Sequence, residues 1–313
     1  MAVVMNSYIE VGNYVFRDRI ASVQVKSSWK DLADTAIIKL PNLARQSDGK
    51  RVEALIQPGD AVLIKLGYDG DLREEFRGYV ASVKPTMPLE VHCEDEMWQL
   101  KRRTVSQSWR STSLREVLEY LVPQANIECP DITLSPFRLD NVSVAKALQK
   151  LRDEYLLTVY YRQGTLHVGF PYFEKLPTIY YHFQKNAIME GLEYRRQEDV
   201  KVKVKVIGIM PNNTREEIEI GDGEGDTFTL HFYNKRGAEL RSVAEQKLAG
   251  MKYDGYRGHF IGFGVPRPIH GMVVDLRDDR YPERAGKFFV DAVTTTFQSD
   301  GFLRQIELGR RAS

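Results

Sequence analysis

The stretch PGDAVLIKLGYDGDLREEFRGYVASV at residues 58–83 returns in a second form near the other end of the chain, as RPIHGMVVDLRDDRYPERAGKFFVDAVTTTF at residues 267–297. Each copy has a turn, a short alternating apolar strand, a charged loop, a glycine followed by an aromatic, and a second alternating strand. The pattern predicts one β-unit used twice. Two related units in one subunit let a small ring present twice as many pseudo-equivalent positions, so the repeat points to assembly.

The composition favours a structural protein over a binder of charged partners. The 313 residues are 42% hydrophobic and 28% charged, enough for two or three domains, and the net charge of +1 gives no overall attraction to nucleic acid or anionic membranes. No apolar run approaches the ~20 residues of a spanning helix, and the first residues lack the features of a signal peptide. Cys93 and Cys129 stand in no metal-ligand spacing, so we expect neither a disulfide scaffold nor structural zinc.

Changes of periodicity divide the chain into three parts. Residues 1–92 read as strands and predict a first β-barrel-like domain. Residues 93–172 begin with an acidic and then a basic cluster and turn helical, which predicts an inserted α+β domain. Residues 173–313 return to strands with one helix and predict a second β-barrel-like domain. The expected fold is therefore mainly β with an inserted α+β domain.

Two helices are expected in the inserted part. Ser113 can cap the segment LREVLEYLV and Ser143 can cap VAKALQKLRDEY, and each segment carries an apolar stripe at helical spacing. The segments LLTVYYR and TLHVGF follow as a strand pair that turns at Gln163 and Gly164.

The last part contains the clearest strand of the sequence. In DVKVKVKVIGI, valines alternate with Lys201, Lys203 and Lys205, which predicts one apolar and one solvated face. The lysine stripe could contact phosphate or an acidic partner, and an edge or solvent-facing strand that resists aggregation explains it too. NNTREEIEIGDGEGDTFTLHFY is expected to form a hairpin, and ELRSVAEQKLAGMKYDGY a helix.

The order of these parts resembles the tail hub, or late control protein, of contractile-tailed phages, which is related to the trimeric base of the type VI secretion spike. The resemblance covers most of the chain and rests on PGDAVLI with FRGYVASV, on SVAEQKLAGMKYDGYRG, and on HGMVVDL, GKFFVDAVTTTF and FLRQIELG. It implies a homotrimer in which two tube-type domains per subunit build a pseudo-sixfold ring between a hexameric tail tube and a threefold spike. Because the chain stops at Ser313 without a β-needle, we expect the spike to be a separate polypeptide.

The inserted part has a second resemblance. LREVLEYLVPQANIE followed by ITLSPFRLDNVSVAKALQKLRDEYLLTVYYRQGTLHVG is similar to the small βαββα modules of secretins, which also build rings. A secretin-like ring protein is therefore one alternative, although it would need an export signal.

Enzymatic interpretations have weaker support in the sequence. The six histidines at positions 92, 167, 182, 231, 259 and 270 are scattered, and no catalytic motif joins them. The spacing of Asp222, Glu224 and Asp226 matches the start of a calcium-binding loop, but the later ligands, including the glutamate near position twelve, are missing. We therefore expect a solvated hairpin turn. A cell-wall-degrading, glycosidase-like component could use Glu74 with Glu75, or Glu94-Asp95-Glu96, but both groups are expected in loops.

The sequence therefore predicts a non-enzymatic tail hub. We expect no catalytic, cofactor-binding or metal-binding residues, and no specific nucleic-acid binding or membrane insertion. The expected partners are two further copies of the chain, a tail-tube or tube-initiator protein, and a spike. The expected location is the baseplate of a virion or injection particle assembled in the bacterial cytoplasm. The loops DGDLREE and RDDRYPERAG occupy equivalent places in the two copies and are predicted to contact the next subunit or the tube.

Overall fold

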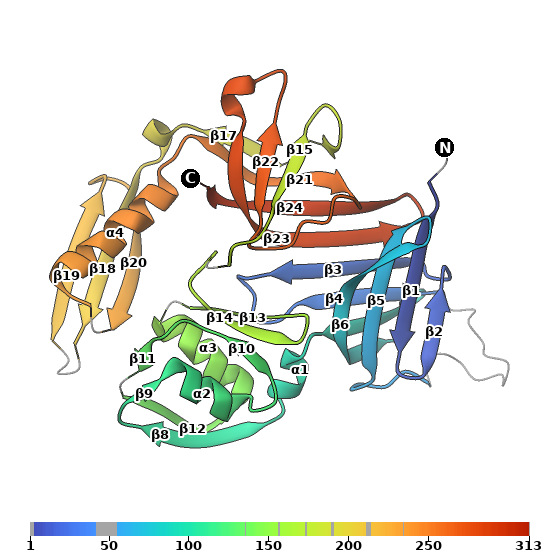
Figure 1. The fold of residues 1–313 in the computed structure, drawn as a ribbon, viewed down its shortest axis with the longest axis horizontal. Helices are drawn as coiled ribbons and strands as arrows, with labels where there is room; N and C mark the ends of the chain where they lie inside the picture. The colour runs from blue at the N-terminus through green and yellow to red at the C-terminus, as the bar shows by residue number, and fades with distance from the viewer. Residues whose placement is uncertain are drawn as a thin grey trace.

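A 14-stranded sheet runs through both ends of the chain (Figure 1). The computed structural model describes residues 3–41, 55–134, 136–155, 157–172, 174–188, 191–210, 214–233 and 235–312. The first part of the chain supplies β1 Met5–Val11, β2 Tyr14–Arg17, β3 Ser22–Ser28, β4 Thr35–Leu40, β5 Ala61–Tyr68, β6 Asp71–Lys84 and β7 Leu89–Glu94. The last part supplies β15 Thr178–His182, β16 Ala187–Ile188, β17 Leu192–Arg195, β21 Gly255–Phe263, β22 Val273–Arg277, β23 Gly286–Gln298 and β24 Gly301–Arg311.

The repeat seen in the sequence is present as the same set of backbone hydrogen bonds. Gly59 donates to the Val80 carbonyl over 2.8 Å, and Val80 donates back to Asp60. In the second copy Gly271 donates to the Val290 carbonyl over 2.8 Å, and Val290 donates back to Met272. Both glycines have a positive φ, and a register shift follows Val80 on β6 and Val290 on β23. The strand pairs β5–β6 and β22–β23 are therefore one β-unit used twice.

The two units share one open sheet instead of forming separate closed barrels. β3 of the first unit pairs with β23 of the second in an antiparallel register that runs from Ser28 opposite Ala292 to Ser22 opposite Gln298. One hydrophobic cluster forms the core of the first unit and also includes Phe297 and Phe302 from the last part of the chain. A second cluster surrounds Phe260 and Ile306. The predicted mainly β fold with an α+β insertion is confirmed.

The middle of the chain forms a small module of helices and short strands, which Figure 1 shows in green below the sheet. Ser113 caps α2 in a reciprocal capping box with Glu116, and the Ser143 hydroxyl accepts from Lys146 N at the start of α3, so both predicted caps are present. The turn at Gln163 joins β13 to β14 as expected. The elements are β8 Thr104–Trp109, β9 Thr112–Ser113, β10 Asn126–Glu128, β11 Thr133–Leu134, β12 Phe137–Ser143, β13 Thr158–Arg162, β14 Thr165–Gly169, α1 Met97–Leu100, α2 Leu114–Leu121 and α3 Val144–Tyr155.

A third, smaller layer is inserted between β17 and β21. It consists of β18 Val202–Ile209, β19 Arg215–Gly221, β20 Asp226–Tyr233 and α4 Gly237–Met251, and a short 3-10 turn at Gln197–Asp199 precedes it. A second 3-10 turn, Pro282–Arg284, lies in the second β-unit, between β22 and β23. The predicted hairpin is wrong, because β19 and β20 lie on opposite sides of β18, antiparallel and parallel to it. Its first residues, 212 and 213, lie outside the described part of the chain.

The alternation of β18 has a packing reason. Val204 and Val206 are buried against Leu240 and Ala244 of α4. On the other face Lys205 pairs with Glu217 of β19 over 2.6 Å. The lysine stripe therefore belongs to a central strand with acidic neighbours, so the expectation of an edge strand is wrong. The face that carries Lys203 and Lys205 is partly exposed to solvent.

Candidate functional site

A polar cavity lies where the two β-units and the inserted module meet. Its walls come from β3, β6, the segment after β7, the β13–β14 turn, the segment before β22, β23 and β24. The lining is rich in carboxylates and arginines: Asp34, Glu74, Glu75, Asp95, Glu96, Arg77, Arg162, Arg267 and Arg304. Two carboxylate groups that the sequence offered separately, Glu74-Glu75 and Asp95-Glu96, thus line one cavity.

Glu75 is buried by an irregularity of β6. The register against β5 shifts between Ile64 and Lys65, which leaves Glu75 as the extra residue of a bulge, with a side chain 4% exposed. A bulge turns a side chain away from the face that alternation would give it. The expectation that Glu74 and Glu75 lie in a loop is therefore wrong, as is the loop expected at DGDLREE, which is mostly strand β6.

Arg304 holds Glu75 in a bidentate ion pair. Its two terminal nitrogens donate to the two carboxylate oxygens over 2.9 and 2.7 Å, and its Nε donates to the Gly264 carbonyl. Arg267 adds a third bond to Glu75 over 3.1 Å. Glu75 comes from the first β-unit and both arginines from the second. With both oxygens occupied by cations, this carboxylate joins the units and is poorly placed for general acid-base chemistry.

A second acidic pair lies beside it. The Asp95 carboxylate accepts hydrogen bonds from the backbone N–H groups of Asp34 and Met97, both over 2.9 Å, and so holds the start of α1. Burial raises the pKa of Asp34 to about 7. Burial, and then the charge of Asp34, raise the pKa of Asp95 well above its ordinary value. The pair fixes the connection between β3 and β4 against the chain that enters the module.

A third cluster connects the module to the second unit. Arg162 of β13 donates to Glu174 over 2.6 Å and to the His270 carbonyl over 2.8 Å. The Tyr160 hydroxyl donates to the same Glu174 oxygen, and its ring packs edge-on against His270 at 4.5 Å. Burial, with help from Arg162, lowers the pKa of His270 to about 3, so this histidine is neutral at ordinary pH.

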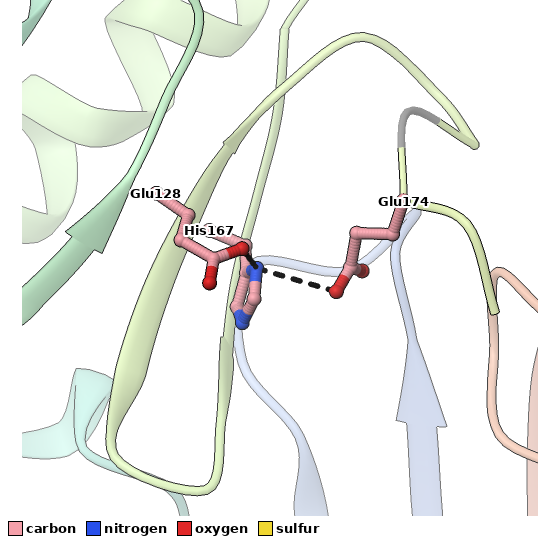
Figure 2. A group of neighbouring side chains, drawn as sticks. All are labelled: Glu128, His167 and Glu174. Atoms are coloured by element: carbon pink, nitrogen blue, oxygen red, sulfur yellow. Dashed lines mark ion pairs between the residues drawn. The ribbon is translucent and has the colours of Figure 1, made fainter.

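Glu128, His167 and Glu174 form the group closest to a metal-ligand set among the described residues (Figure 2). His167 Nδ1 lies 3.2 Å from a Glu128 oxygen and 3.5 Å from Glu174 Oε1. Desolvation lowers the pKa of His167. However, Arg162 and Tyr160 both bind the other oxygen of Glu174, so its charge is already neutralised. This arrangement fits a polar junction better than a cation site.

The other candidates of the sequence do not converge. His92 lies beside Glu90, and His182 lies beside Asp279. The ring of His259 lies next to Gly191, and the side chain of His231 is outside the described part. Asp222 accepts from Lys252 over 2.7 Å and does not form a calcium loop among the described residues. Sequence reasoning missed Asp34, Arg162 and Arg304, because nothing in their local patterns separates them from surface charges.

Comparisons with known proteins bear on the fold. No family model matches the chain, and no curated protein matches it. Among solved structures, a tail protein from Neisseria meningitidis superposes with a TM-score of 0.70 at 15% identity, covering 98% of this chain and 96% of that one. A 43 kDa prophage tail protein from Shewanella oneidensis gives a TM-score of 0.63 at 12% identity, covering 97% and 98%.

The chain has the fold of these tail proteins. An E. coli component of the type VI secretion system, described as structurally similar to the T4 bacteriophage tail proteins gp27 and gp5, gives a TM-score of 0.58 at 9% identity and covers 100% of this chain and 80% of that one. The resemblance inferred from the sequence is thus confirmed at the level of this tail-protein fold. Within the described residues, no helix is both long and apolar enough to cross a membrane.

Proposed function

We propose that the protein is the structural hub of a phage tail or contractile injection machine, a trimeric ring with pseudo-sixfold symmetry that joins the tail tube to a separate spike. The observation that carries the proposal is the internal duplication, in which Gly59 with Val80 and Gly271 with Val290 close equivalent units by equivalent hydrogen bonds. Three copies of a chain with two such units supply six near-equivalent positions, which matches a hexameric tube on one side and a threefold spike on the other.

The comparisons support the same setting. Two of the similar structures are described as tail proteins, and a third as a type VI secretion component. We accordingly place the protein in the baseplate of a virion or injection particle, assembled in the bacterial cytoplasm. Its partners are two further copies, a tube or tube-initiator protein and a spike, with neither nucleic acid nor membrane as a specific ligand.

The hub acts by binding and not by bond chemistry. In the polar cavity Glu75 is held by two arginines, and Asp95 holds backbone N–H groups, so the buried charges stabilise junctions between parts of the chain. We keep the division into residues 1–92, 93–172 and 173–313 as part of the proposal. It is supported by a separate hydrophobic cluster around Leu118 and Leu148 in the middle part.

The test is the absolute mass of the purified protein by light scattering after size exclusion, over a range of concentrations. We expect a species of three times the 36.0 kDa chain mass. Electron microscopy of that species should show a ring with six lobes. A protein that stays monomeric at every concentration, or that stops at a two-fold dimer, would contradict the trimeric hub.

A further inference from the structure

One junction between a second unit and a first unit already exists inside the chain. β3 adds to the edge of β23 just beyond the register shift that follows Val290, so that Ser28, Ser27 and Lys26 lie opposite Ala292, Val293 and Thr294. This contact extends the sheet of the second unit into the first. It shows how an edge of one unit receives a strand of the other.

For the reverse junction, from a first unit to a second, both strands lie at sheet edges in the part of the chain that the structure describes. Beyond the register shift that follows Val80, Ser82–Lys84 of β6 pairs only with β7 among the described residues. On the other side of the molecule, β17 pairs only with β21 in that same part of the chain. Among the described residues, both strands therefore have one edge without a neighbouring strand, and such an edge can accept a further strand.

The duplication identifies these edges as equivalents of the two strands in the internal junction. Val80 and Val290 are equivalent, so Ser82–Lys84 corresponds to residues 292–294 of β23. β4 pairs with β7 in the first unit, and its equivalent β21 pairs with β24 in the second. In the same way, β3 pairs with β4, and its equivalent β17 pairs with β21. Following these registers, Lys26 of β3 corresponds to Glu193 of β17.

We propose that β17 of one copy pairs antiparallel with Ser82–Lys84 of β6 in a second copy of this chain, in the register of the internal β3–β23 junction. That register places Arg195 opposite Ser82, Tyr194 opposite Val83, and Glu193 opposite Lys84. This inference rests on the proposed ring and names the surfaces that close it.

The charges at the two edges fit this pairing. Lys84 and Glu193 are both exposed, and no ion pair involving Lys84 occurs among the described residues. The one ion pair of Glu193 within the described ranges is with Arg195 of its own strand, over 2.7 Å. Directly opposed residues of opposite charge stabilise an antiparallel pair, whereas like charges destabilise it.

One exposed apolar side chain lies near each of the two edges. Met87, in the turn that follows β6, is 84% exposed. Ile188 of β16, on the other edge, is 50% exposed. Isolated exposed apolar residues are common, so the matched strand edges and their charges carry the inference.

Within one copy the two edges are well separated in the sheet. Six strands lie between β17 and β6, which is on the order of 30 Å along the sheet at about 4.8 Å per strand: β21, β24, β23, β3, β4 and β7. The two surfaces differ, so the contact is head-to-tail. Such a contact gives a closed ring when the rotation closes.

A disulfide between copies tests the register. The variant combines Ser82→Cys with Arg195→Cys in a Cys129→Ser background, because Cys93 is buried and Cys129 is half-buried. Residues directly opposite on antiparallel strands have Cα atoms about 4.5–5.5 Å apart, within the range that a disulfide spans. After mild oxidation we expect covalent dimers and trimers on a non-reducing gel. Each single-cysteine variant should stay monomeric on the gel, as should the control pair of Arg17→Cys with Arg195→Cys.

Charge reversal gives an independent readout that leaves the fold intact. Lys84→Glu should weaken association of copies about tenfold, since it sets two carboxylates opposite each other. Adding Glu193→Lys should restore the association. The matched control is Lys146→Glu, an exposed change on the inserted module that should have no effect.

The outcomes separate this inference from the hub proposal. If the wild-type protein is trimeric but the double-cysteine variant forms no covalent species and Lys84→Glu has no effect, the pairing of β6 with β17 is wrong while the ring stands. A wild-type protein that is monomeric at every concentration overturns both.

Discussion

The first and second β-units have the same frame of backbone hydrogen bonds but very different surroundings. In the first unit β5 lies against the antiparallel strand β1, whereas in the second β22 lies against the parallel strand β15. Residues 29–34 join β3 to β4, but the equivalent link from β17 to β21 spans residues 196–254 and contains β18–β20 and α4. The frame is therefore set by the backbone, while links and neighbouring strands are free to differ.

The units also differ in what they bury at one equivalent position. Leu89 on β7 and Arg304 on β24 match through the strand registers, and both are almost fully buried. Leu89 packs into an apolar core, but Arg304 needs Glu75 from the other unit. The second unit therefore depends on the first at this point in a way that the first unit does not depend on the second.

Removing Glu75 should produce the largest loss of stability. Glu75→Ala leaves Arg304 buried without its carboxylate, which we expect to cost about 3–5 kcal/mol in the free energy of unfolding by urea. The double variant Glu75→Leu with Arg304→Leu, in which position 304 takes the side chain of its counterpart Leu89, should recover most of this loss. Arg73→Ala on the exposed part of β6 is the control and should change little. An equally large loss in the double variant would show that the ion pair is not the cause.

The short link of the first unit should give the protein a dependence of stability on pH. Burial raises the pKa of Asp34 to about 7 from an ordinary value of 3.8, so between these values the native state holds more protons than the unfolded state. Its stabilising contribution is therefore fully present below about pH 4 and is lost as the pH rises to about 7, with a slope of at most about 1.4 kcal/mol per pH unit.

Asp34→Asn should remove that slope, because the amide keeps an acceptor for Ser28 N without a charge. The measurement is the unfolding free energy of both proteins from pH 4 to pH 8, and the quantity of interest is their difference. Asp31→Asn, at an exposed ion pair with Lys26, serves as the control for loss of one carboxylate in the same link. A difference between wild type and Asp34→Asn that does not change with pH would contradict the raised pKa.

Alanine at the two equivalent glycines should lower the free energy of unfolding unequally in the two units, and by less than the changes above. Both Gly59 and Gly271 have a positive φ, so alanine at either position costs about 1 kcal/mol through backbone strain. A Cβ at Gly59 would lie 3.1 Å from the Trp98 ring, whereas at Gly271 the nearest atom is 3.4 Å away on Leu176. We expect Gly59→Ala to cost about 2 kcal/mol in total and Gly271→Ala about 1 kcal/mol. If urea titrations gave equal losses of unfolding free energy for the two variants, or a larger loss for Gly271→Ala, the proposed difference in packing would be wrong.

The repeat, the helices and their caps could be predicted from the sequence because each rests on neighbouring residues. Ser113 and Glu116 are three positions apart, and the alternation of β18 is visible in eight residues. The buried role of Glu75 could not be predicted, since a bulge against β5 breaks the alternation that would have indicated it. The placement of β19 and β20 around β18, and the meeting of Arg162 with His270, depend on contacts between distant segments. The cavity residues lie on such contacts, so local patterns could not assemble them.

The smallest effect is expected from adding a metal ion at the junction between the inserted module and the second unit, because its carboxylate already has partners. Glu174 is already bound by Arg162 and Tyr160, so adding equimolar zinc to the chelator-treated protein should leave its thermal midpoint unchanged. His167→Gln should respond to zinc as the wild type does. A cation that did bind would have to compete with the Arg162 guanidinium for Glu174 and would stabilise the native state by mass action. A rise of the midpoint with zinc in the wild type that is absent in His167→Gln would therefore convert this junction into a metal site, one that the first β-unit does not share.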